Sequence, residues 1–176
     1  VVTVAEKGKG NGQGEITKTD ISCGAMIAAT GAEPAKAAGF LYGESENVLT
    51  QIELEKLLYE DRFDGGAKNI VMIQCVGSRN DEHPYCSRIC CSMAVKNALG
   101  IKKRNPDANI YILYRDMRTY GFREKYYRMA RDAGIVFIRY NEGKPPVVSR
   151  DNGLLVQVDS LDINDRVEIE ADHVIL

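Results

Sequence analysis

Apolar residues recur in two rhythms along this chain, and the change between them predicts most of its elements. After Gly66, short apolar runs alternate with amphipathic stretches. Buried strands are expected at residues 69–75, 109–115 and 135–140, and helices at residues 91–105 and 122–134. This order predicts a parallel sheet covered by helices on both faces. From residue 145 on, apolar and polar residues alternate around the turn Asp151-Asn152-Gly153, which predicts an antiparallel β-meander and then a final apolar strand.

The first part of the chain follows a less regular pattern. Two strands around a glycine-rich turn are expected at its start, and the apolar run GAMIAATG, residues 24–31, predicts a third strand that ends at Thr30 and Gly31. A short helix is predicted from Thr50, because Glu53 three residues later completes a capping box. The fold class is therefore expected to be α/β, with a Rossmann-like parallel sheet and a β-meander.

Composition narrows the range of partners. The 23 basic and 25 acidic residues leave a net charge of −2, so there is no basic field to attract nucleic acid or an anionic membrane. No apolar run approaches the roughly 20 residues that span a bilayer, and the start VVTVAEKGKG lacks the layout of a signal peptide. A small molecule or another protein in the cytoplasm is the expected partner.

Both ends lie inside expected strands and no initiator Met is present, so the chain is expected to be a fragment of a larger protein.

Four of the five cysteines stand close together, at Cys75, Cys86, Cys90 and Cys91. They follow the first buried strand, where a nucleotide-binding fold needs several glycines so that its backbone can approach a pyrophosphate. Only Gly77 is present there, in the run CVGS, so NAD binding of the usual kind is not expected. A local cysteine cluster in a chain with long helix and strand patterns indicates metal or redox chemistry rather than a secreted disulfide framework.

Several chemistries are compatible with this cysteine spacing. Four thiolates are what a [4Fe–4S] cluster needs, one for each iron. Cys86 and Cys90 face the same way if they share a helical turn. Cys91 points about 100° away from Cys90 on a regular helix, so both bind one group only if the turn is irregular or the group lies at the helix start. A structural zinc site, a thiol–disulfide couple and buried unliganded cysteines are the alternatives, and His83 could replace one ligand.

The order of elements is similar to the pyridine-nucleotide half of thioredoxin-reductase-like flavoproteins, in which each half ends in an acidic residue, an apolar strand and Ala-Thr-Gly. DISCGAMIAATGAEP, residues 20–34, follows that pattern. The run QCVGSRNDEHPYCSRICC, followed by AVKNAL and YRDMRTYG, more specifically resembles the A subunit of heterodisulfide reductase, a flavin and iron–sulfur protein. The resemblance implies that residues 1–33 are the C-terminal tail of an FAD-binding half, residues 34–66 a connection with a short helix, and residues 67–176 an NAD-binding-like domain that carries the cysteine cluster.

The same resemblance implies a function. The ligands of a [4Fe–4S] cluster would be Cys75, Cys86, Cys90 and Cys91. Thr30 and Gly31 would approach FAD, which is bound mostly by parts outside this chain. The chain is thus expected to be an electron-transfer segment of a larger oxidoreductase, without catalytic residues and inactive when isolated. Implied partners are other redox subunits of a heterodisulfide-reductase-like complex, ferredoxin or hydrogenase-type proteins. The alternatives are a structural zinc or interaction module and an NAD(P)H-dependent flavin disulfide reductase.

A few further residues carry expectations. Cys23 is expected to lie in the core, and His173, in a strand, to be structural. Four charged residues follow the second buried strand: Arg115, Asp116, Arg118 and Arg123. Asp116 stands where a nucleotide-binding fold contacts a ribose. Because the glycine fingerprint is missing, these charged residues are expected to form a solvated or partner-facing loop.

Overall fold

The computed structural model describes residues 1–7 and 16–176, which divide into two compact units, Val1–Pro34 and Ala35–Leu176. The first unit is an antiparallel hairpin of β1 (Val2–Lys7) and β2 (Ile16–Ile21), as its alternating sequence predicts. The glycine-rich turn expected between these strands falls on residues 8–15, outside the described residues. The assignment of residues 1–33 to an FAD-binding half stays a prediction.

The third strand expected in this first unit is not formed. Residues 22–34 contain neither helix nor strand, and Cys23, Thr30 and Gly31 are exposed. A strand requires a neighbour that accepts and donates its backbone hydrogen bonds. Within the described residues, no strand pairs with this segment. The predictions of a strand at residues 24–31 and of a core position for Cys23 are therefore wrong for this structure.

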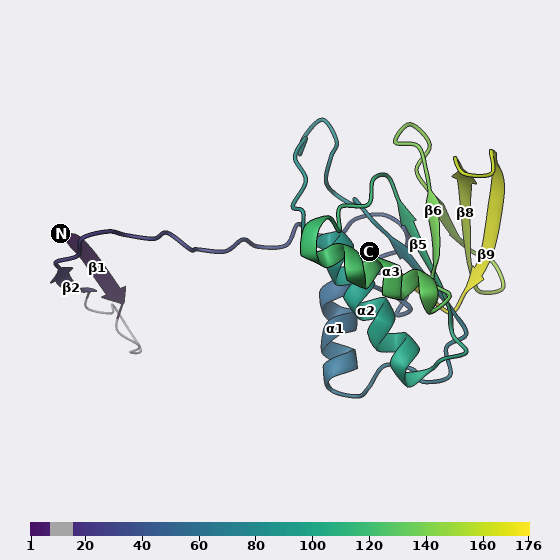
Figure 1. Cartoon of the computed structure of the whole chain (residues 1–176), viewed down its shortest axis with the longest axis horizontal. Helices are drawn as coiled ribbons and strands as arrows, with labels where there is room; N and C mark the ends of the chain where they lie inside the picture. Colours follow the sequence, from purple (N-terminus) through teal and green to yellow (C-terminus); the bar gives the residue numbers. More distant parts are fainter. Residues whose placement is uncertain (8–15) are drawn as a thin grey trace. The chain divides into compact units, whose positions relative to one another are not determined.

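A five-stranded parallel sheet forms the centre of the second unit (Figure 1). In spatial order its strands are β3 (Val48–Leu49), β10 (His173–Ile175), β4 (Asn69–Ile73), β5 (Asn109–Tyr114) and β6 (Val136–Arg139). The strands predicted from the three apolar runs are β4, β5 and β6. The final apolar strand, β10, lies between β3 and β4, and the Asp172 carboxylate before it accepts the backbone N–H groups of Lys68 and Asn69 at 2.7 and 2.8 Å.

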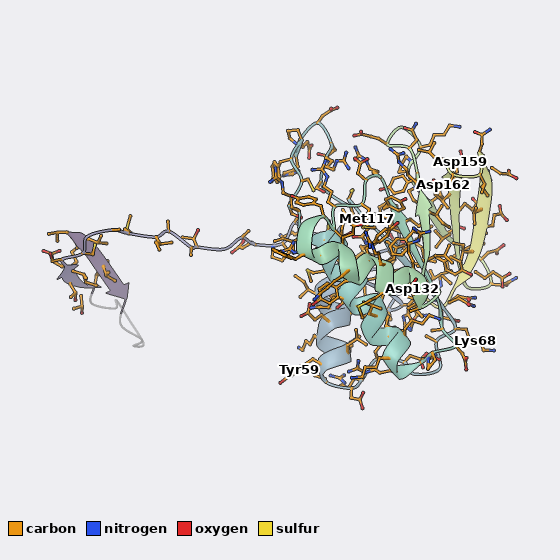
Figure 2. All side chains as sticks on the ribbon, viewed as in Figure 1. Tyr59, Lys68, Met117, Asp132, Asp159 and Asp162 are labelled. Atoms are coloured by element: carbon orange, nitrogen blue, oxygen red, sulfur yellow. The ribbon has the colours of Figure 1, made fainter. Side chains whose placement is uncertain are left out.

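The helices cover one face of this sheet. They are α1 (Gln51–Tyr59), α2 (Cys90–Arg104) and α3 (Glu124–Asp132), with a short 3₁₀ turn, η1 (Gly121–Arg123), before the last. Leu54, Ala94 and Ala130, one from each helix, are fully buried against Ile70 and Ile112 of the sheet. Met117, labelled in Figure 2, packs against the same cluster from the loop after β5.

The opposite face is covered by the antiparallel sheet β7 (Val147–Arg150), β8 (Leu154–Ser160) and β9 (Asp165–Ala171). The α/β class with a parallel sheet and a β-meander is confirmed, but the expectation of helices on both faces is wrong. Alternate residues of β8 and β9, such as Val156 and Ile169, pack against Val71, Leu113 and Val174. Because the meander already offers an apolar face, it buries this side of the sheet in place of helices.

Local signals in the sequence set the helix ends. The Thr50 hydroxyl accepts the Glu53 backbone N–H at 3.2 Å, and the Glu53 carboxylate accepts the Thr50 backbone N–H at 2.7 Å. This is the predicted capping box. After α3, Gly134 adopts φ +77° and its N–H binds the Arg131 carbonyl at 2.9 Å, a conformation that glycine adopts without strain.

Candidate metal centre

Cys75 lies just beyond β4, at the carboxyl edge of the parallel sheet. The preceding residue, Gln74, donates its backbone N–H to Leu113 at 2.9 Å, and its carbonyl accepts the hydroxyl of the buried Tyr140 at 2.7 Å. Cys75 itself adopts φ +67°, in the left-handed region, and Gly77 follows at φ +69°. The chain therefore turns sharply away from the sheet at the first cysteine, with the strand behind it held rigidly.

The turn continues into a loop at residues 78–89 that contains no helix or strand. The loop is closed on itself: the N–H groups of Arg79 and Asn80 both point to the His83 carbonyl, at 2.6 and 3.2 Å, and the His83 N–H binds the Asn80 side chain at 2.7 Å. A charged, hydrogen-bonded loop thus occupies the place of a glycine-rich phosphate loop. That NAD is not bound there in the usual way stays a prediction.

Cys90 and Cys91 are the first two residues of α2. The Cys91 side chain is buried, at 2% exposure, and its sulfur lies 3.8 Å from the backbone carbonyl of Asp116 after β5. The thiol of Cys90 contacts the Cys91 thiol, the Ser87 hydroxyl and the Cys75 backbone. The helix start therefore brings Cys75, Cys90 and Cys91 together, which is the arrangement that the sequence allows for two adjacent cysteines.

These contacts change the acidity of the three thiols. Hydrogen bonds, chiefly from the Cys91 thiol and then from the Ser87 hydroxyl and two backbone N–H groups, lower the pKa of Cys90 to about 6 against the opposing effect of burial. The pKa of Cys91 is raised because its proton is held by Cys90 and because it is buried. Burial raises the pKa of Cys75, as does nearby Cys90, while Arg79 and Arg115 act in the opposite direction. One thiolate, on Cys90, is thus already stabilised at neutral pH.

Cys86 lies apart from this group of three. It is half-buried in the loop, and its sulfur accepts the backbone N–H of Arg88 at 3.3 Å. Among the described residues, no set of three or more His, Cys, Asp or Glu side chains is arranged to hold a metal ion. The donors nevertheless fit a thiolate-bound cluster in kind and number: the Cys90 thiol contacts the Cys91 thiol and the Cys75 backbone, and Cys86 lies in a segment without helix or strand hydrogen bonds.

The charged residues after β5 brace the cysteine loop. Arg115 donates to the Arg79 carbonyl at 2.9 Å and pairs with Glu142, while Asp116 binds the Arg79 guanidinium at 2.7 Å. The expectation of a solvated loop is therefore wrong for Arg115, which keeps only 11% of its side chain exposed, whereas Asp116 keeps 44% exposed while it binds Arg79. That the charged loop faces a partner stays a prediction. The sequence pattern did not identify Arg79 as part of the site. Its ion-pair partner, Asp116, is 37 positions away, so no local pattern reveals the contact.

A pocket opens beside Cys75 at this edge of the sheet. Its volume is about 180 Å³, and its lining includes Cys75, Gly77, Arg79, Arg115 and Tyr140. The carboxyl edge of a parallel sheet is where α/β folds bind ligands. The first cysteine thus borders a hollow at the position that a nucleotide takes in related architectures.

The other residues that the sequence analysis named lie outside the group of Cys75, Cys90 and Cys91. His173 is mostly buried and packs on Phe63 with ring centroids 5.0 Å apart, which agrees with a structural role. His83 lies in the cysteine loop, where its ring contacts Tyr85. Thr30 and Gly31 belong to the first unit, and their predicted contact with FAD stays a prediction.

The lowered pKa of Cys90 leads to a testable expectation for the metal-free protein. A group with a depressed pKa is ionised above that value, so Cys90 should react with iodoacetamide at pH 7 nearly as fast as at pH 8, and should lose reactivity below about pH 6. Mass spectrometry of the alkylated peptide measures this. The Ser87→Ala variant, which lacks one donor to the thiolate, should move the loss of reactivity to higher pH. A Cys90 rate that falls tenfold from pH 8 to pH 7 would contradict the assignment.

Several known proteins are similar to this chain in sequence. No protein-family model matches the chain. The chain is 39% identical, over 89% of its length, to the A subunit of the H(2)/formate:CoB-CoM heterodisulfide,ferredoxin reductase of Methanococcus maripaludis. It is 40% identical, over 77% of its length, to the iron-sulfur A subunit of the CoB–CoM heterodisulfide reductase of Methanocaldococcus jannaschii. The chain is related to the A subunits of heterodisulfide reductases. The resemblance first indicated by the cysteine run is therefore confirmed.

The match to these heterodisulfide reductase A subunits covers only a part of each relative. The chain spans 26% and 23% of the length of these two proteins, and 25% of the corresponding protein of the ferredoxin:CoB-CoM heterodisulfide reductase of Methanosarcina acetivorans, to which it is 37% identical. Among solved structures, the flavoprotein disulfide reductase RclA of Escherichia coli matches 82% of this chain and 26% of its own, at a TM-score of 0.48 and 12% identity, too distant a likeness to support an inference. No helix in residues 1–7 and 16–176 combines the length and apolarity needed to cross a bilayer.

Proposed function

We propose that this chain is the electron-transfer segment of a flavoprotein oxidoreductase like the A subunit of heterodisulfide reductase, in which it holds a [4Fe–4S] cluster close to FAD. The observation that carries the proposal is the meeting of Cys75, Cys90 and Cys91 at the carboxyl edge of the sheet, from two segments separated by a loop. The fourth ligand is Cys86, on that loop. When bound, the cluster supplies one-electron transfer.

Each part of the site has a task in this function. The end of β4 fixes Cys75, and the first turn of α2 presents Cys90 and Cys91, which together with Cys75 would hold the cluster. Arg79 and Arg115 offset the negative charge that four thiolates bring together. The loop is tied to the end of β5 through Arg79 and Arg115, and it would have to bring Cys86 to the other three cysteines for all four to bind the cluster. The chain positions and shields the cluster and contributes no catalytic acid, base or nucleophile, so the isolated segment is inactive.

The proposal extends to the rest of the protein. Thr30 and Gly31 lie on the segment that matches the flavin-approaching loop, and most of the FAD site lies in parts of the protein beyond this chain. The partners are other redox subunits of the complex and ferredoxin or hydrogenase-type proteins, in line with the names of the relatives, which include ferredoxin reductases. A reducing compartment, the cytoplasm, keeps such thiols available.

The test is an anaerobic metal analysis with a spectrum. Iron, sulfide and zinc are measured in the full-length protein and in this chain, and the ultraviolet–visible spectrum is recorded before and after dithionite. A cluster in this chain corresponds to about four irons and four sulfides with a brown absorption that dithionite bleaches. One zinc and no colour would replace the proposal with a structural zinc module. Spectral changes on adding NADH to flavin-loaded protein would instead favour an NAD(P)H-dependent reductase.

A further inference from the structure

Arg79 is held at every polar position of its backbone and at its side chain. Its N–H binds the His83 carbonyl at 2.6 Å, its carbonyl accepts from Arg115 at 2.9 Å, and its guanidinium binds Asp116 at 2.7 Å. Its φ is +60°, an unfavourable conformation for a residue with a side chain, which the surrounding bonds maintain. Only 19% of the side chain is exposed. The guanidinium is therefore restrained in its position by the bond to Asp116, although its Nη1 is buried without a hydrogen-bond partner among the described residues.

That position is against the cysteine group. The Arg79 guanidinium lies beside the Cys75 sulfur, and Asp116, its partner, offers its backbone carbonyl to the Cys91 sulfur at 3.8 Å. Arg139 also approaches the Asp116 carboxylate, at 3.6 Å. The Arg79 side chain thus lies at one cysteine, and the backbone of its partner Asp116 contacts a second, while the Asp116 carboxylate binds Arg79.

A fixed charge next to a redox group changes its reduction potential. Adding an electron makes a thiolate-bound cluster more negative, so a nearby cation stabilises the reduced state and raises the potential, whereas an anion lowers it. Arginine keeps its charge throughout the accessible pH range, so its effect does not depend on protonation. The neighbouring Asp116 cancels part of the effect, and it also holds the guanidinium in place.

We propose that the Arg79–Asp116 pair sets the reduction potential of the cluster bound by this chain, with Arg79 raising the potential and Asp116 positioning Arg79 while moderating its charge. The inference rests on the proposed function, because it concerns the same cluster. Arg79 acts through its charge and Asp116 mainly by positioning Arg79, and neither is one of the four proposed ligands. Opposite effects of the two members are the signature of electrostatic control.

The experiment is a potentiometric titration of the full-length protein, followed by electron paramagnetic resonance of the reduced cluster. In Arg79→Gln, we expect the midpoint to fall, so that the reduced-to-oxidised ratio at a fixed potential decreases about tenfold, which is about 59 mV for a one-electron couple. In Asp116→Asn the midpoint should rise, because the substitution removes a negative charge near the cluster while the backbone bonds of Arg79 still hold that residue. The control is Arg128→Gln, which removes an arginine that is 73% exposed and paired with Glu124 on α3. Its midpoint should equal that of the wild type.

The outcomes separate the inference from the proposed function. A cluster-loaded Arg79→Gln protein with the wild-type midpoint would overturn the inference alone. Shifts of both variants in the same direction would also overturn it, because they would report a loosened loop rather than the loss of individual charges. If Arg79→Gln loses its cluster, Asp116→Asn decides: a raised midpoint supports the inference and an unchanged or lowered midpoint overturns it. A wild-type protein without iron and sulfide at this site would overturn the proposed function, and the inference with it.

Discussion

Replacing Cys90 with alanine in the full-length protein is expected to abolish the iron–sulfur cluster of this segment. Each iron needs one sulfur ligand from the protein, and Cys90 carries the thiolate that its surroundings stabilise most. Iron and sulfide per protein, counted relative to the other clusters of the molecule, should each fall by about four. The matched control is Cys23→Ala, because Cys23 is exposed in the first unit and should leave the iron content unchanged.

The Cys86→Ala variant tests whether Cys86 is the fourth ligand of the cluster. Cys86 is the one proposed ligand that the structure does not bring to the other three. A loss of cluster equal to that in Cys90→Ala would show that the loop supplies the fourth ligand. Unchanged cluster content and normal electron transfer would refute the assignment of Cys86 and direct attention to His83 in the same loop.

Replacing Ile112 with alanine is expected to reduce the free energy of unfolding by about 3 kcal/mol, within the range found for buried Ile and Leu truncations. Ile112 is fully buried in β5, between the neighbouring strands and under the helices. Such a loss is a large part of the about 5–15 kcal/mol that stabilises a typical domain. Urea unfolding followed by circular dichroism measures the change.

The control for this experiment is Ile163→Ala. Ile163 is 65% exposed in the turn between β8 and β9, so its truncation should change the free energy of unfolding by less than about 0.5 kcal/mol. Equal effects of the two substitutions would contradict the position of Ile112 in the core.

The sequence pattern predicted most elements of the second unit, for local reasons. The apolar runs that became β4, β5 and β6 need only their own composition to be recognised as buried strands. The start of α1 is visible in Thr50 and Glu53 because a capping box involves four consecutive residues. The alternation in β8 and β9 likewise predicted a meander.

The pattern failed where the outcome depends on a partner elsewhere in the chain. GAMIAATG has the composition of a strand, yet residues 22–34 form none because no described strand pairs with them. The sequence predicts that both faces of the parallel sheet are buried but not which element covers each. Val156 of the meander packs on Val71, a contact that joins residues far apart in the sequence.

The candidate site likewise has features that the local sequence predicts and features that depend on residues far away in the chain. By itself, the sequence determined the four clustered cysteines, the absence of the glycine fingerprint and the resemblance to heterodisulfide reductase, because residue identity and spacing are all that these require. Only the tertiary structure decided that Cys75 meets Cys90 and Cys91 while Cys86 stays apart, and that Arg79 lies between Cys75 and Asp116. The physical reason is that such contacts arise when parallel strands bring their carboxyl ends to one edge, and this pairing joins residues that are dozens of positions apart.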